Sequence, residues 1–257
     1  MQPLNRHRDA WLWRLIATAA CFVVFGLGGV ILCGVLVPLL FVLPGDGARR
    51  RRRARAMVSR AFYLHVQFMY RTGVLDFRID GAETLGQPGQ LIVANHPSLI
   101  DAVFLISQIR DTNCVIKPGL WTNPCIGAAA RAAQYISSDG ADMLERAASA
   151  LREGQTLVVF PEGTRTRPGQ APQFHRGAAA IALRGARIIT PVFISVTPPT
   201  LTKAAPWYHI PYCRFIVQLR VGAAIDPARF KDAPMPIASR RLNQYLHQLF
   251  HKELDVS

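Results

Sequence analysis

The residues from Leu15 to Leu43 include no Asp, Glu, Lys, Arg or His. About 20 apolar residues in a helix are enough to cross the hydrocarbon core of a bilayer. Inside lipid, a single segment satisfies its backbone polar groups by forming a helix. The segment is too long for the apolar region of a signal peptide, and no small-residue cleavage site follows it, so we expect it to be retained. We therefore predict an N-terminal membrane-embedded helical segment.

This apolar segment can be placed in a membrane in two ways. Several of its residues weaken or interrupt a helix: Gly26, Gly28, Gly29, Gly34 and Pro38. One tilted span and a re-entrant helical hairpin are both compatible with them. Because Arg6, Arg8 and Arg14 precede the segment, both of its flanks are basic, and the hairpin is favoured if both flanks are cytoplasmic.

A cluster of arginines follows the apolar segment: Arg49 to Arg53, and Arg55. Beside a lipid-embedded segment, such a cluster binds anionic head groups and favours the cytoplasmic side. Residues 1–75 contain eleven Arg, no Lys and two acidic residues, so most of the net charge of +14 belongs to this membrane-proximal part. Nucleic-acid binding is disfavoured, because no basic groove with interleaved aromatic residues is visible.

From Gly73 onward, short β-rich runs alternate with helical stretches, which is typical of an α/β domain with a mainly parallel sheet. The predicted strands are Leu75–Ile79, Leu91–Ala94, Cys114–Lys117, Thr156–Phe160, Ile188–Ile194 and Phe215–Val221. The predicted helices are Ser98–Arg110, Asn123–Ala133, Ala141–Arg152, Gly177–Arg184 and Ile237–Glu253. We expect a central sheet flanked by helices, and a surface loop at Thr197–Tyr212 that dips toward lipid.

The chain is therefore divided into two parts. Residues 1–72 form the membrane anchor with the arginine cluster, and residues 73–257 form the α/β domain. Within the anchor, Ala56 to Thr72 is a predicted helix with several aromatic residues, which either lies at the membrane interface or packs on the core. The five cysteines are an odd number without a close pair, so neither a disulfide framework nor a zinc site is expected.

His96 and Asp101 follow the predicted strand Leu91–Ala94 directly. On one continuous helix, residues five apart are separated by about 140° of rotation and point away from each other. Pro97 keeps His96 out of the helical conformation and itself suits the first helical position, so we expect Asp101 in the second turn to reach back to the imidazole. A His oriented by a carboxylate is suited to remove the proton of an attacking hydroxyl.

A second motif, Phe160 to Arg165 (Phe-Pro-Glu-Gly-Thr-Arg), ends another apolar strand. With the run from Asn95 to Asp101, it resembles the glycerolipid or lysophospholipid acyltransferase family, which includes the 1-acylglycerol-3-phosphate acyltransferases. The resemblance runs from about Gly81 to Gly222. Two weaker blocks support it: Lys117-x2-Leu-x3-Pro-x2-Gly, and the strand Ile189 to Val192.

This resemblance implies O-acyl transfer from acyl-CoA or acyl carrier protein to the free hydroxyl of a lysophospholipid such as 1-acylglycerol-3-phosphate. Residues 73–257 are then the acyltransferase domain. The catalytic pair is His96 and Asp101, and the substrate-binding residues are Glu162, Gly163, Thr164, Arg165 and Lys117. Backbone amides near Gly163 are candidates to stabilise the oxyanion. No metal or cofactor is required.

The implied partners are the lysolipid acceptor, the acyl donor and membrane lipids, with no nucleic acid. We expect a bacterial inner membrane, with the catalytic domain on the cytoplasmic side.

One departure from the family pattern leaves the acceptor open. Where many members have an Arg that helps to hold a phosphate, this chain has Tyr135-Ile136-Ser137-Ser138-Asp139. The alternatives are the same chemistry on a glycolipid, an amino-acid lysolipid or a specialised metabolite, or a non-catalytic lipid-binding protein. A serine-hydrolase route is disfavoured because the chain has no Gly-x-Ser-x-Gly motif.

Overall fold

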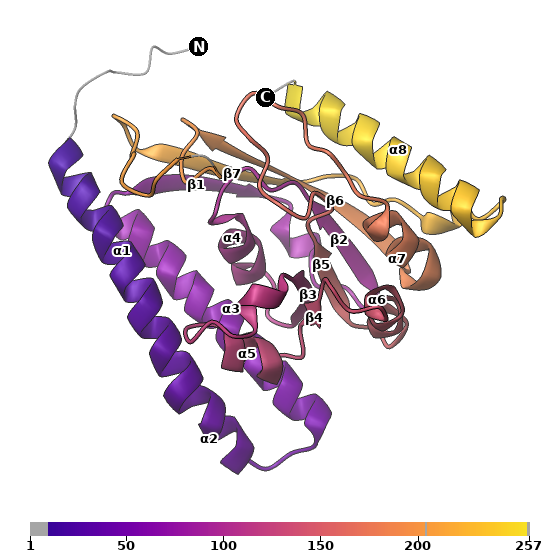
Figure 1. Ribbon diagram of the computed structural model, residues 1–257, viewed down its shortest axis with the longest axis horizontal. Coiled ribbons are helices and arrows are strands. Elements are labelled where there is room, and N and C mark those ends of the chain that lie inside the picture. Colours follow the sequence, from indigo (N-terminus) through magenta and orange to yellow (C-terminus); the bar gives the residue numbers. More distant parts are fainter. Residues whose placement is uncertain (1–9, 204, 256–257) are drawn as a thin grey trace.

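The computed structural model describes residues 10–203 and 205–255, so Arg6 and Arg8 lie outside the described part. A seven-stranded sheet forms the centre, and helices cover both of its faces (Figure 1). The strands are β1 Leu75–Asp80, β2 Gln90–Ala94, β3 Thr112–Ile116, β4 Ile136–Ser137, β5 Thr156–Val159, β6 Ile188–Thr197 and β7 Phe215–Val221. The predicted α/β class with a mainly parallel sheet is confirmed.

The strand order is β1-β7-β6-β2-β5-β3-β4. Every neighbouring pair is parallel except β6 and β7. The carboxyl ends of β2, β3, β5 and β6 therefore meet at one edge of the sheet, which is where ligands bind in open α/β folds. β4 was not predicted, because two residues carry no periodic signal.

Side chains of β2 alternate between two cores, as the two-residue period of a strand requires. Leu91 and Val93 pack against α6 Met143–Arg152, α7 Gly177–Gly185 and α8 Met235–Asp255. Ile92 and Ala94 face the opposite core, which contains residues of α4 Asp101–Ser107 and α5 Gly127–Ala132 and of the N-terminal helices. Three short 3-10 turns, η2 Ala82–Thr84, η3 Pro118–Leu120 and η4 Pro227–Phe230, complete the connections.

The apolar segment forms one long helix, made of α1 Trp11–Ile31, a π-helical turn η1 Leu32–Leu36 and α2 Val37–Val42. The π turn precedes Pro38, where the normal helical hydrogen bond is lost. The helix does not fold back on itself, so the re-entrant alternative is not the conformation found. With 32 residues and 22% of its most apolar window buried, this helix is long and apolar enough to cross a membrane.

α3 Gly47–Arg71 turns back and runs along α1 (Figure 1). It starts nine residues before the predicted helix at Ala56, because Asp46 caps it by accepting the Arg49 N–H at 2.7 Å and because Arg and Ala are strong helix formers. The arginine cluster therefore lies on this helix. Arg55 is only 2% exposed and donates to Ala133 O, Asp111 and Gln155, so it serves the fold rather than lipid head groups.

The N-terminal helices share cores with the sheet. Cys21 of α1 and Met69 of α3 belong to the same buried cluster as Leu75 of β1 and Phe104 of α4. α1 and α3 therefore pack onto residues of the 73–257 part, and the walls of any cavity there include both parts of the chain.

Candidate active site

The turn after β2 brings His96 and Asp101 together. His96 Nδ1 lies 2.9 Å from Asp101 Oδ2, and the same oxygen accepts the Ser98 N–H at 2.6 Å. The bond from the Ser98 N–H to a side chain three residues later is one of the two hydrogen bonds of a capping box. The helix begins at Asp101 and not at Ser98 as predicted, because the turn bonds elsewhere: Leu99 N–H donates to Leu201 O, and the Ser98 hydroxyl donates to Thr200 O. Asp101 is therefore in the first helical turn, and Pro97 precedes the helix.

Burial sets the electrostatics of this pair. Asp101 is fully buried, which raises the pKa of its carboxyl, although the hydrogen bonds from His96 and Ser98 and the charge of Arg165 oppose that shift. The His96 side chain is 20% exposed. With Nδ1 donating to the carboxylate, Nε2 is the nitrogen left to accept a proton, and it makes no hydrogen bond to the described part of the chain.

Glu162 holds the His96 backbone from the loop after β5. Its Oε1 accepts the His96 N–H at 2.8 Å and its Oε2 accepts the Thr166 hydroxyl, while Thr166 N–H donates to His96 O at 2.9 Å. Glu162 is 5% exposed, and burial raises its pKa to about 7 against the opposing effect of the His96 N–H. The carboxylate therefore contacts the histidine main chain, and Thr166, which was not predicted, completes the link.

We expect the raised pKa of Glu162 to make stability depend on pH. Between its ordinary pKa near 4.5 and about 7, the folded protein keeps a proton that the unfolded chain releases, so stability falls as pH rises through this window. The loss is at most about 3 kcal/mol. In detergent, the melting temperature of Glu162→Gln should fall less from pH 5 to pH 8 than that of the wild type. Equal slopes would contradict the assignment.

The other predicted binding residues lie around this turn. Arg165 Nη1 donates to Leu201 O at 2.8 Å and Thr202 O at 3.1 Å, and its guanidinium forms no ion pair with Glu162 or Asp101. Thr164, beside Arg165, is half-buried. Lys117 is exposed between β3 and η3, at the same edge of the sheet.

Gly163 favours glycine because its φ of +62° lies in the left-handed region, and a Cβ there would be in ordinary contact with the His175 ring, at 3.6 Å. Its N–H donates to Phe160 O at 3.1 Å, so this one of the amides near Gly163 is already paired. This hydrogen bond closes a turn, which the sequence motif alone does not reveal. The amides of Thr164 and Arg165 make no hydrogen bond to described residues.

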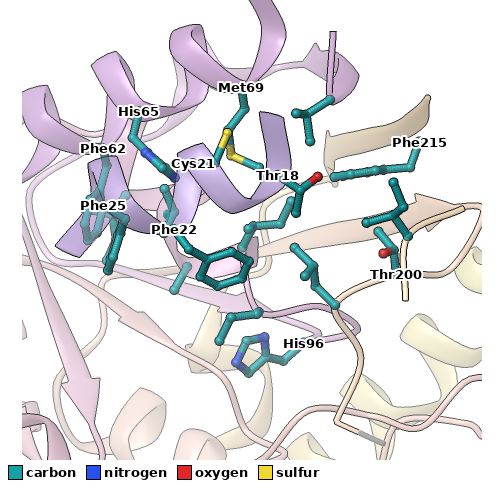
Figure 2. Close-up of a pocket in the computed structure, with 18 of the residues that line it drawn as sticks. Thr18, Cys21, Phe22, Phe25, Phe62, His65, Met69, His96, Thr200 and Phe215 are labelled. Carbon is teal, nitrogen blue, oxygen red and sulfur yellow. The ribbon is translucent and has the colours of Figure 1, made fainter. Parts of the chain in front are cut away.

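An apolar cavity of about 400 Å³ adjoins His96. Figure 2 shows His96 at one side of it, across from side chains of α1 and α3 that include Phe22, Cys21 and Met69. Leu99, Ile100 and Val103 form the wall near the turn after β2. The sequence placed the α1 segment in lipid and gave no sign that it would line the site.

A second apolar cavity of about 370 Å³ lies farther along α1 and α3, bounded also by α5. The two cavities share a partition in which Phe25 stacks on Phe62 with ring centroids 6.2 Å apart and meets His65 edge-on at 5.2 Å. Because Phe25, Phe62 and His65 line both cavities, we expect the loss of one of these rings to join the two spaces.

The sequence model of the family described as Acyltransferase matches residues 76–195, from β1 into β6. This range contains His96, Asp101 and the whole loop from Glu162 to Thr166. Residues 76–195 therefore form a domain of the acyltransferase family.

Several relatives of this acyltransferase are called 1-acyl-sn-glycerol-3-phosphate acyltransferase. The one from Saccharomyces cerevisiae is 28% identical over 73% of this chain and 62% of its own length. The one from Pseudomonas aeruginosa is 24% identical over 65% of each chain. The alpha form from Ovis aries is 27% identical over 85% of this chain and 77% of its own. The alignments thus span just under two thirds of the yeast and bacterial proteins.

The acyltransferase also resembles a solved structure. The crystal structure of the 1-acyl-sn-glycerophosphate (LPA) acyltransferase PlsC from Thermotoga maritima matches with a TM-score of 0.73, over 94% of this chain and 96% of that one. At 20% identity, this likeness establishes the fold.

Among the described residues, no cluster of three or more His, Cys, Asp or Glu is arranged to hold a metal ion.

Proposed function

We propose that this acyltransferase moves an acyl group from the thioester of acyl-CoA or acyl carrier protein to the free hydroxyl of 1-acylglycerol-3-phosphate at a membrane surface. The observation that carries the proposal is the His96–Asp101 pair, whose free Nε2 borders an apolar cavity. The names of the relatives support the acceptor, since each is named for acylation of 1-acyl-sn-glycerol-3-phosphate.

In the proposed reaction, His96 Nε2 takes the proton of the acceptor hydroxyl while Asp101 stabilises the resulting imidazolium. The oxygen forms a bond to the thioester carbonyl carbon, giving a tetrahedral intermediate with a negatively charged oxygen. Collapse of this intermediate breaks the carbon–sulfur bond, and the imidazolium returns the proton to the departing thiolate. No covalent enzyme intermediate forms, and His96 ends in its starting state.

Two sets of groups are available to stabilise the charges in this reaction. Among the backbone amides near Gly163, the N–H groups of Thr164 and Arg165 make no hydrogen bond to described residues and are the candidates for the oxyanion site. Only Nη1 of Arg165 is engaged by the carbonyls of the loop after β6, so the rest of the guanidinium can face the phosphate of the acceptor or the donor. Lys117 would add positive charge at the same edge of the sheet.

The apolar cavity is the proposed site for an acyl chain. Its walls are almost entirely hydrocarbon, and α1 contributes several of them, so the chain would pass between the protein and its own membrane helix. The exposed outer side of α1 is apolar as well, which supports contact with lipid along this helix.

Phe25→Ala is expected to lengthen the acyl chain that the enzyme prefers, because loss of this ring joins the cavities of about 400 and 370 Å³. Competition among saturated acyl donors of increasing length, with products identified by mass, measures the shift. Val23→Ala is the matched control, since Val23 is exposed on the same helix and lines neither cavity. An unchanged length profile in Phe25→Ala would contradict the role of the partition.

A different acceptor is the second candidate, favoured by one observation. At the end of β4, where a phosphate-binding Arg is common in the family, the Ser137 hydroxyl donates to Asp139 at 2.5 Å. An acidic residue there disfavours a bound phosphate. A glycolipid, an amino-acid lysolipid or a specialised metabolite would avoid this repulsion.

The test is an acceptor panel. Membranes from an expressing strain are incubated with labelled acyl-CoA or acyl carrier protein and with each acceptor, and the products are identified by mass. Phosphatidic acid as the main product supports the proposal, and acylation of only a phosphate-free acceptor overturns it. Thioester consumption that no acceptor increases would favour a non-catalytic lipid-binding protein with background hydrolysis.

A further inference from the structure

The loop between β6 and β7, residues 198–214, exposes aromatic side chains that the proposed reaction does not use. Trp207, Tyr208 and Tyr212 are 44%, 51% and 72% exposed. Trp and Tyr combine an apolar ring with a polar tip, and they are enriched at the interface between lipid and water. Three such side chains on one loop point to a partner that is apolar at depth and polar at its surface.

This aromatic loop adjoins the apolar helix α1. The Trp207 ring packs on Phe22 of α1 with centroids 5.6 Å apart, and the buried guanidinium of Arg14 donates to Tyr212 O. Figure 2 shows Thr200 and Phe215, which lie near the two ends of the loop, on the same side of the cavity as Thr18 of α1. The loop and the helix therefore form one structural unit.

The helix α1 also exposes apolar side chains that do not contact the loop. Leu12, Ile16 and Val23 are spaced so that they share one face of the helix, and all three are exposed. Because α1 contacts the aromatic loop through Phe22 and also exposes this apolar face, lipid is favoured over a protein partner, since the same bilayer can cover both.

The charge of the loop fits an anionic surface. No Asp or Glu occurs between Glu162 and Asp226, whereas Lys203 and Arg214 are exposed on either side of the aromatic residues. Basic residues next to interfacial aromatic residues are attracted to anionic head groups. The basic residues and the exposed aromatic side chains of the loop therefore both favour an anionic bilayer as the partner.

The loop is also fixed to the catalytic turn. Thr200 O accepts the Ser98 hydroxyl at 3.0 Å, and Leu201 O accepts both Leu99 N–H and Arg165 Nη1. Farther along, Ile210 and Pro211 line the cavity beside His96. A surface bound by this loop would thus be held at a defined position relative to the site.

We propose that loop 198–214 is a second membrane contact, which seats Trp207, Tyr208 and Tyr212 among the head groups of an anionic bilayer, beside the apolar cavity. This inference goes beyond the proposed function, since it concerns how the site meets its membrane and holds whichever lipid is acylated.

Fluorescence of Trp207 tests this contact directly. The full chain carrying Trp11→Phe, Trp13→Phe and Trp121→Phe retains Trp207 alone and is reconstituted into phosphatidylethanolamine–phosphatidylglycerol vesicles. Lipids with a nitroxide near the head group should remove about half of its emission, and lipids labelled deep in the chain should remove less. In the matched control, Trp207 is also changed to Phe and the exposed Gln244 of α8 to Trp, and no lipid quenching is expected.

A double variant, Tyr208→Ala with Tyr212→Ala, tests the consequence for activity. Neither side chain lines a cavity of the site. Transfer to acceptor in vesicles should fall by about 10-fold, equivalent to about 1.4 kcal/mol, with little change in detergent micelles. Gln244→Ala with Gln248→Ala on α8 is the control.

The outcomes separate this inference from the proposed function. Quenching of Trp207 emission by iodide in solution but not by lipid nitroxides would overturn the membrane contact and favour a protein partner. Acyl transfer in vesicles by the Tyr208→Ala, Tyr212→Ala variant at the wild-type rate would also overturn the contact. Failure of every acceptor to be acylated would overturn the proposed function, while the fluorescence result would still decide the contact.

Discussion

Acyl transfer by the His96→Ala variant is expected to fall by about 10²–10⁴-fold, the usual contribution of a positioned general base. The substitution removes the imidazole but leaves the two backbone bonds of residue 96, to Glu162 and from Thr166, in place. The loop geometry should therefore survive, and the loss should appear in the chemical step. Product formation in membranes from an expressing strain measures it, and thermal unfolding in detergent checks the fold.

The control for this variant is His175→Ala. The His175 ring lies close to Gly163, but the residue is exposed, and the structure gives it no contact with His96 or Asp101. We expect His175→Ala to remain active. If His96→Ala retains more than about a tenth of wild-type activity, the loss is smaller than the smallest loss expected on removing a general base. The proposed mechanism would then be wrong.

Asp101→Asn is expected to lower acyl transfer by about 10–10³-fold without unfolding the protein. In the structure, Ser98 N–H and His96 both bond Oδ2, while Oδ1 has no hydrogen-bond partner among the described residues. An amide oxygen in the place of Oδ2 would keep both bonds, so the histidine would retain its orientation. What is lost is the negative charge, which stabilises an adjacent cation by about 1.4–4 kcal/mol.

Asp101→Ala separates that charge from the geometry. It leaves Ser98 N–H without its buried partner, at a cost of about 1–3 kcal/mol, and it frees the imidazole to rotate. We expect it to be less stable than Asp101→Asn and at most equally active, by denaturant unfolding and by the same transfer assay. An Asp101→Asn variant as active as the wild type would show that the carboxylate charge is not used.

The fold and the contact between His96 and Asp101 were predictable because both depend mainly on local sequence patterns. β7 has the bounds expected from its alternating apolar residues, and β6 differs only in running three residues past its expected end at Ile194. His96 next to Pro97 after a buried strand was enough to predict that Asp101 would meet the ring, although the helix starts three residues later than expected.

The rest of the site depends on contacts between distant segments. The bonds from Ser98, Leu99 and Arg165 to residues 200–202 join three loops that no local pattern relates. Arg55 looked like a head-group ligand because its neighbours in the sequence are arginines, yet it is buried among three acceptors. Contacts between residues 36 to 102 positions apart in the sequence decide both cases.

The wall that α1 gives to the cavity beside His96 bears on how this enzyme could be handled outside a membrane. Deleting the helix would remove Phe22 and Phe25 from the wall and open the cavity to water, so we expect a truncated protein to lose the proposed acyl-chain site together with its proposed anchor. A water-soluble form would instead keep the inner face of α1 and replace outward residues such as Leu12, Ile16 and Val23 with polar ones. The helix is therefore part of the enzyme's interior as well as its proposed membrane anchor.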